Sequence, residues 1–193
     1  MIVEAFVLVF GLGVALLRLS KTPATFPLRV LSTIYTDVFR GVPVILVVYL
    51  IGFGVPALDI DVDRVVLGGI ALTLCYTAYV AEVYRAGLRS VHPTQRESGL
   101  AVGLSERQAL RHIVLPQAVR NVGPPLLNDF ISLQKDVALI AVIGVTGEAF
   151  KQAQIAQAAE FNYTPLLGAA LIYLAVTVPL ARLLDWWEGR RER

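Results

Sequence analysis

The sequence offers few of the groups on which enzymes and metalloproteins depend. Its single cysteine, Cys75, lies inside an apolar run, so no intrachain disulfide can form and no cysteine metal cluster is offered. The two histidines, His92 and His112, lack the helical spacing of a zinc site. No G-x-x-x-x-G-K-[ST] phosphate loop is present. We therefore expect a chain that is not an enzyme, hydrolyses no ATP itself and holds neither a cofactor nor a metal.

Charge is scarce as well. Charged residues make up 17% of the 193 residues, and the net charge of +2 is too small to suggest nucleic acid as a partner. Hydrophobic residues make up 56%, and the mean hydropathy of +0.66 is high for a soluble domain. Several windows of about 17 to 25 residues have the length that crosses a hydrocarbon core of about 30 Å. The composition predicts an all-α protein that crosses the lipid bilayer several times.

Five apolar segments are long enough to cross the bilayer, and no internal repeat or low-complexity linker divides residues 1–193, so we expect one domain. Gly41 and Pro43 interrupt the second segment, in which we expect a kinked helix, because proline removes an amide donor and clashes with the preceding turn. We expect the fourth segment to be entered through Pro124 and Pro125. The expected spans are about residues 1–18, 30–57, 65–88, 121–145 and 163–185.

Two segments outside these spans also have a predicted structure. Residues 146–162 are polar and rich in alanine, which indicates an amphipathic helix outside the bilayer. After the fifth span, Trp186 and Trp187 fall at the depth of the membrane interface, where tryptophan is enriched. A basic tail ends the chain.

The order of charges along the chain predicts its orientation in the membrane. Arg18 and Lys21 follow the first apolar run, which argues against a cleaved signal peptide and for a first span with its N-terminus outside. That run is barely long enough to cross, so the span is short or its true start lies upstream. Of 17 basic residues, 13 fall in the segments that would then be cytoplasmic. The positive-inside rule therefore places the C-terminus and the connection at residues 90–118 in the cytoplasm.

The connection at 90–118 is the one long polar segment between apolar runs. Gly103 breaks a stretch that otherwise has a helical pattern, and Pro116 is expected to close the segment before the next span. A helix, a glycine corner and a second helix can project from a membrane domain into a groove on a partner. The alternative is a pair of surface amphipathic helices without a partner.

Polar residues in the fourth span are candidates for a transport pathway. They follow one another in steps of three, four and seven, which places them along one stripe of a helix. Charges at membrane depth are costly and usually face a bundle interior or a water-filled cavity. The alternative is structural: Lys135 and Asp136 could each pair with a neighbouring span. The stripe contains Asn128, Asp129, Ser132, Lys135 and Asp136.

Three further polar positions need an interpretation. Glu82 and Arg85 are three residues apart and are expected to form a structural pair near the cytoplasmic interface. Arg40, beside the predicted kink, is either part of a gate or extends its charge to the headgroups. We include Arg40 and Tyr79 among the pathway candidates.

Several blocks of the sequence resemble a known family. Glu97 to Pro116 is similar to the cytoplasmic "EAA" loop of ABC-importer permeases. The segment Phe39-Arg40-Gly41-Val42-Pro43 resembles the F-R-G-x-P of polar amino-acid permeases, and residues 78–87 resemble their A-Y-x-A-E-x-x-R-x-G. Residues 115–118 with 124–126, and 130–136 with 142–145, match two further blocks. The similarity covers the chain from about Leu16 onward.

The resemblance implies a five-span type I ABC-importer permease bundle with a cytoplasmic coupling helix. It implies import of a polar amino acid, such as glutamate, glutamine, arginine or histidine, across the bacterial cytoplasmic membrane by alternating access. The implied partners are ABC ATPase subunits that hold ATP and Mg, a second permease subunit, identical or homologous, and an extracytoplasmic amino-acid-binding protein. The implied ATPase-coupling residues are Glu97, Ser98, Gly99, Ala101, Gly103, Leu104, Ile113, Leu115 and Pro116.

The chain departs from the family pattern at three places. Ser98 and Gly99 stand where relatives have Ala-Ala, although these small residues still permit a close helix approach. Relatives carry more sequence before the first span. Residues 137–139 are Val-Ala-Leu where many relatives have Thr-Ser-Leu, and the loss of two hydroxyls leaves the substrate open. The alternatives are a permease for another small solute and, from a different class, a membrane enzyme or scaffold.

Overall fold

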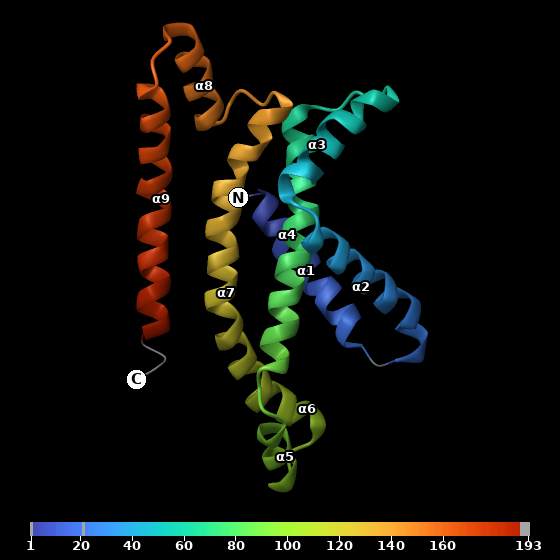
Figure 1. Cartoon of the computed structure of the whole chain (residues 1–193). Coiled ribbons are helices and arrows are strands. Elements are labelled where there is room, and N and C mark those ends of the chain that lie inside the picture. The colour runs from blue at the N-terminus through green and yellow to red at the C-terminus, as the bar shows by residue number, and fades with distance from the viewer. Residues whose placement is uncertain (1, 21, 190–193) are drawn as a thin grey trace.

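The computed structural model describes residues 2–20 and 22–189, and this part of the chain contains helices and no strand. Figure 1 shows α4 at the centre and crossed by α1, with α2 and α3 on one side and α7 on the other. The basic residues Lys21, Arg190, Arg191 and Arg193, which support the predicted orientation, lie outside the described residues. The main helices are α1 (Ile2–Leu19), α2 (Phe26–Gly41), α3 (Val44–Gly54), α4 (Arg64–Arg89), α7 (Leu115–Asp136) and α9 (Thr164–Gly189).

The packing of α1 against α4 forms the centre of the molecule. A Cβ atom at Gly11 of α1 would lie 2.7 Å from Val80 Cγ1, so the absence of a side chain lets the two helices approach closely. At the start of α4 the Asp63 carboxylate accepts hydrogen bonds from the amides of Val65 and Val66, as a helix cap does. The buried core lies around α4 and includes Val7, Val47, Val48, Leu67, Leu72, Tyr76, Val80, Leu133 and Ile143.

The second predicted span, 30–57, is not a single kinked helix. Helices α2 and α3 meet at an angle of 102°, with Val42 and Pro43 between them. Val42 is extended, with φ −93° and ψ 133°, because the ring of a following proline disfavours the helical conformation. The interruption was predicted, but the bend is much larger than that of a kinked helix. The two helices form a broken span or a re-entrant loop.

The helix that contains the start of the fourth predicted span, 121–145, begins earlier than predicted. Helix α6 (Glu106–Ala109), a π-helical turn (Leu110–Val114) and α7 follow one another without a break. Pro116 therefore does not close the preceding segment, and it lies at the start of α7, directly after the π turn. The π turn directly before it absorbs the local misfit, as such turns commonly do.

Pro124 and Pro125 were expected at the entrance of this span, but they lie inside α7. Helix α7 continues to Asp136 and changes there into a 3-10 helix, Val137–Ile143, which ends at Gly144 with φ +89°. The predicted span 121–145 thus corresponds to the second half of a longer helix together with this 3-10 segment.

Three helices of the described chain are long and apolar enough to cross a membrane: α1, α4 and α9. They match the predicted spans at 1–18, 65–88 and 163–185, with Met1 outside the described residues. The α2–α3 pair, taken as one broken span, would make four. Helix α7 is not among them by length and composition, so the count of five remains a prediction.

The last two helices form an arm beside α7. The predicted helix in the polar segment is present as α8, Ala149–Glu160. The Glu148 carboxylate is buried, accepts hydrogen bonds from the amides of Phe150 and Lys151, and also accepts one from the Tyr173 hydroxyl of α9. Near the other end of α9, the Trp187 ring packs where a side chain at Gly123 would lie. Figure 1 shows α9 standing apart from α4.

Candidate coupling loop and transport pathway

The polar connection forms the predicted helix, corner and second helix. Helix α5 spans Pro93–Ala101, the chain turns at Gly103 with φ +90°, and α6 begins at Glu106. A residue with a side chain rarely adopts this φ, which explains the glycine. In Figure 1, α5 and α6 lie together beyond the ends of α4 and α7, at one extremity of the molecule.

A close approach at a glycine, an ion pair and a helix cap hold the corner closed. A Cβ at Gly99 would carry its side chain into Ile113, because that Cβ would lie 2.6 Å from Ile113 Cδ1. Arg96 of α5 forms an ion pair with Glu106 of α6, with Nε donating to Oε2 over 2.9 Å. At the start of α6, Ser105 and Gln108 cap each other's backbone amides. The corner is therefore a built element, not a loose loop.

The nine predicted coupling residues divide into two groups. Gly99 is buried, and Leu104 and Ile113 are partly buried, so these three pack the corner from inside. The remaining residues are exposed and are available to a partner: Glu97, Ser98, Ala101, Gly103, Leu115 and Pro116. Val102, at the tip beside Gly103, is 79% exposed and was not among the candidates. The S-x-x-Q signature at Ser105 and Gln108 could have revealed the cap from sequence.

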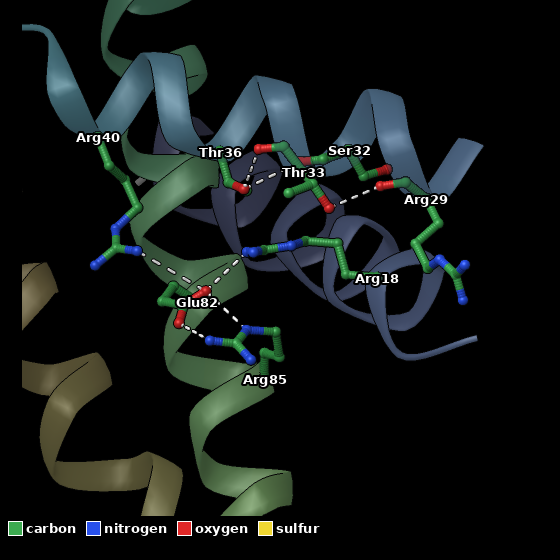
Figure 2. A network of polar contacts seen from close by, with 8 residues as sticks. All are labelled: Arg18, Arg29, Ser32, Thr33, Thr36, Arg40, Glu82 and Arg85. Carbon is green, nitrogen blue, oxygen red and sulfur yellow. Dashed lines mark hydrogen bonds and ion pairs between the residues drawn. The ribbon is translucent and has the colours of Figure 1, made fainter. Parts of the chain in front are cut away.

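Glu82 lies at the meeting point of three helices (Figure 2). Its predicted pair with Arg85 is present, with Nε donating to Oε2 over 2.9 Å and a second bond to Oε1. Arg18 of α1 also donates to Oε2, over 2.7 Å. Arg40 at the end of α2 approaches the same oxygen to 3.8 Å. Arg18 lies 64 residues from Glu82 in the chain, so no local spacing could have predicted that the two residues pair.

A cavity of about 520 Å³, lined by polar and apolar residues, lies beside this cluster, between α2, α4 and α7. One oxygen of the Asp129 carboxylate, Oδ2, is buried and has no hydrogen-bond partner among the described residues. Three of the seven predicted pathway residues meet here: Arg40, Tyr79 and Asp129. The polar side chains that line the cavity are those of Arg40, Tyr79, Glu82, Ser90, Asn121 and Asp129.

The side chains of the predicted stripe on the fourth span do not share one environment. Asp136 is turned toward α4, where it accepts a hydrogen bond of 2.9 Å from the Tyr76 hydroxyl. Lys135 and Asn128 are exposed, and Ser132 is partly buried. Residues on a helix advance by about 100° each, so five residues spread over nine positions cover an arc wide enough to meet two surroundings. Asp136 thus has the partner on a neighbouring span that the structural alternative proposed.

Comparison with known proteins identifies the architecture. The family described as "Binding-protein-dependent transport system inner membrane component" matches residues 8–193. The chain belongs to this family. Its all-α, type I permease architecture is thereby confirmed, as is the resemblance to ABC-importer permeases.

Two relatives from Bacillus subtilis (strain 168) cover most of this permease. The probable glutamine ABC transporter permease protein is 32% identical over 185 residues, which span 96% of this chain and 84% of the relative. The arginine transport system permease protein is 35% identical over 176 residues, which span 90% of this chain and 78% of the relative.

Two solved structures share the fold of this permease. A crystal structure of an amino acid ABC transporter with histidines matches with a TM-score of 0.88 and 32% identity, over 97% of this chain and 86% of that one. An inward-facing methionine ABC transporter matches with a TM-score of 0.71, over 95% of this chain and 87% of that one. At 19% identity the second likeness concerns the fold alone.

Proposed function

We propose that this permease moves a polar amino acid across the cytoplasmic membrane as part of an ATP-driven importer. The observation that carries the proposal is the closed corner of α5, Gly103 and α6 at one extremity of a bundle of this family. The names of the glutamine and arginine permeases among the relatives support the substrate class.

The coupling loop is the part that a separate ATPase would move. ATP and Mg are held by that subunit, and this chain performs no hydrolysis. The six exposed coupling residues form the surface that enters the ATPase. Because α6, the π turn and α7 are continuous, a displacement of the corner is passed directly into the helix that carries Asp129. A permease can thereby alternate between inward-facing and outward-facing states.

The cavity between α2, α4 and α7 is proposed as the place where the substrate is held. Its volume lies within the roughly 300 to 1,000 Å³ that is usual for small-molecule sites. An amino acid carries a carboxylate and an ammonium group, and the cavity offers an opposite charge to each. Arg40 would bind the carboxylate, and the carboxylate of Asp129, which lines the cavity, would accept a hydrogen bond from the ammonium group.

The complete importer contains further subunits. The apolar helix α9 is hardly covered within this chain, since 6% of its most apolar window is buried, which fits contact with a second permease subunit. An extracytoplasmic binding protein would deliver the substrate. The N-terminus lies outside and the C-terminus in the cytoplasm, with α7 as a further span.

Uptake by proteoliposomes tests the function. The permease with its ATPase and binding protein should accumulate labelled L-glutamine or L-arginine in an ATP-dependent manner. Replacing Gly103 with Trp should uncouple hydrolysis from uptake while membrane insertion survives, because the corner requires φ +90°. Glu97→Lys should act likewise by reversing an exposed charge. Thr94→Ser, also in α5, serves as a control. Normal uptake by both coupling variants would show that this loop is not the ATPase contact.

Topology mapping tests the orientation separately. His112→Cys places an exposed thiol beside α6, and the native Cys75 is buried and contributes little background. A membrane-impermeant maleimide should label position 112 from the cytoplasmic side alone. Labelling from the outer side would place the loop beyond the reach of any cytoplasmic ATPase.

A further inference from the structure

The three arginines around Glu82 do not hold it equally. Its Oε2 atom already accepts hydrogen bonds from Arg18, at 2.7 Å, and from Arg85, at 2.9 Å. Arg40 lies 3.8 Å from the same atom, beyond hydrogen-bond distance. Figure 2 shows the three guanidinium groups arriving at one carboxylate from three directions. Arg40 is therefore the partner that Glu82 holds least.

Exposure distinguishes the same three residues. The Arg18 and Arg85 side chains are 12% and 21% exposed, whereas that of Arg40 is 42% exposed and lines the cavity. Arg18 and Arg85 serve the structure, because they tie α1 to α4 and stabilise one turn of α4. At 3.8 Å, Arg40 donates no hydrogen bond to Glu82 Oε2, which leaves its donors for a ligand in the cavity.

The charges at this place do not cancel. Three guanidinium groups meet one carboxylate, and Asp129 on α7, which Arg40 attracts electrostatically, supplies one more negative charge. One positive charge therefore remains without a counter-ion in this cluster. In a partly buried site such an excess favours the binding of an anionic group.

We propose that Arg18 is a positioning residue that keeps Arg40 available for a carboxylate in the cavity. While Arg18 occupies Oε2 of Glu82, Arg40 is held there only by an ion pair of 3.8 Å without a hydrogen bond, and it can bind the carboxylate of the ligand. When Arg18 is removed, Arg40 forms a hydrogen bond with Glu82 in its place, and the carboxylate of the ligand loses its partner. This inference rests on the proposed function.

The accessibility of Arg40 tests the proposal without any substrate. Phenylglyoxal modifies free guanidinium groups, and peptide mapping by mass spectrometry gives the rate at Arg40 in the purified permease–ATPase complex. Arg18→Gln should slow this rate about tenfold, because Arg40 becomes hydrogen-bonded to Glu82. Arg18→Lys should keep most of the original rate. The double variant Arg18→Gln/Glu82→Gln should restore it, since the competing carboxylate is gone.

Arg29 provides the matched control on the same helix as Arg40. Its side chain donates to the carbonyl oxygen of Ser20 and points away from Glu82 in Figure 2. Arg29→Gln should leave the labelling of Arg40 unchanged. An unchanged rate at Arg40 in Arg18→Gln, with the complex intact by size-exclusion chromatography, would overturn the proposal.

A binding measurement addresses the ligand. L-Arginine and L-glutamine are each compared with their methyl esters, which keep the ammonium group and lose the negative charge. The wild type should bind the acid more tightly than the ester, and Arg18→Gln should remove about tenfold of this preference. Acid and ester bound alike by the wild type would refute the role of Arg40. If neither amino acid binds, the proposed substrate class fails, while the labelling result still decides whether Arg18 positions Arg40.

Discussion

Helices α4 and α9 are equally long and similarly apolar, but they differ in how much of their surface the rest of the chain buries. Both contain 26 residues and both pass as membrane spans, yet 56% of the most apolar window of α4 is buried and only 6% of that of α9. Helix α4 carries the cluster at Glu82 and packs against α1, α2, α3 and α7. Helix α9 contacts α7 and α8. Hydropathy thus identifies a helix that can cross a membrane, but it does not show whether other helices of the same chain cover that helix.

The difference follows from close helix contacts at glycine and from charge. Along α4, glycine and alanine allow neighbours to approach, and Glu82 attracts arginines from two other helices. Helix α9 also contains glycine and alanine, but a Cβ at Gly168 would meet nothing within 4 Å, many of its large apolar side chains are exposed, and its ion pair is at the surface. Helix α4 is thus built to hold this chain together, whereas α9 is built for an apolar environment supplied from outside it.

The largest effect is expected where α1 meets α4. Gly11→Val would place a Cβ 2.7 Å from Val80 Cγ1 and 3.3 Å from the Ala81 amide nitrogen, so the helices must separate. Overpacking of this kind costs about 1 to 3 kcal/mol or more. We expect a clear loss of thermal stability, measured by fluorescence-detected size-exclusion chromatography after heating.

Two glycines without neighbours provide the controls for this substitution. Gly13 lies on α1, like Gly11, and Gly168 lies on α9. A Cβ at either position would meet nothing within 4 Å. Gly13→Val and Gly168→Val should leave the isolated subunit near wild-type stability. If Gly168→Val weakens only the assembled importer, α9 is covered by the second permease subunit. Equal losses from all three variants would contradict the contrast between the two helices.

A moderate effect is expected where α8 is tied to α9. Glu148 caps α8 and accepts a hydrogen bond from Tyr173, so Glu148→Ala removes both interactions. Loss of a cap costs about 0.5 to 2 kcal/mol. Tyr173→Phe removes the hydroxyl alone and should cost about 1 kcal/mol. Hydrogen exchange of the α8 amides should rise in both variants, more in Glu148→Ala.

The measurement has an internal reference. The amides of α4 should keep their protection in both variants, because the arm does not contact that helix through Glu148. If α4 loses protection together with α8, the arm and the central bundle open as one unit, and the comparison between them has to be revised.

The sequence predicted the elements whose cause is local. A glycine inside a helical pattern indicated the corner at Gly103, and a spacing of three residues indicated the pair of Glu82 with Arg85; both are present. The polar, alanine-rich segment is a helix. In each case the residues that determine the structure lie within a few positions of one another.

The remaining features depend on how distant helices cross. Proline at position 43 indicated an interruption, but the angle of 102° depends on what α2 and α3 pack against. Pro124 and Pro125 are tolerated inside α7, where sequence rules place a boundary. Arg18 reaches Glu82 only because α1 crosses α4 near that level. The sequence pattern predicted the polar stripe of α7. It did not predict that Asp129 and Asp136 have different surroundings from Lys135.

The smallest effect is expected at the ion pair of α9. Arg182 and Asp185 are 3.6 Å apart, and their side chains are 80% and 64% exposed. Exposed pairs of this kind contribute about 0 to 1 kcal/mol, because water and salt screen them and ordering two side chains costs entropy. Asp185→Asn should therefore leave the melting temperature of the isolated subunit unchanged within error, at low and at high salt. A salt-dependent loss of stability would mean that this end of α9 is less open to water than its exposure indicates, and that a partner or the membrane interface already covers it.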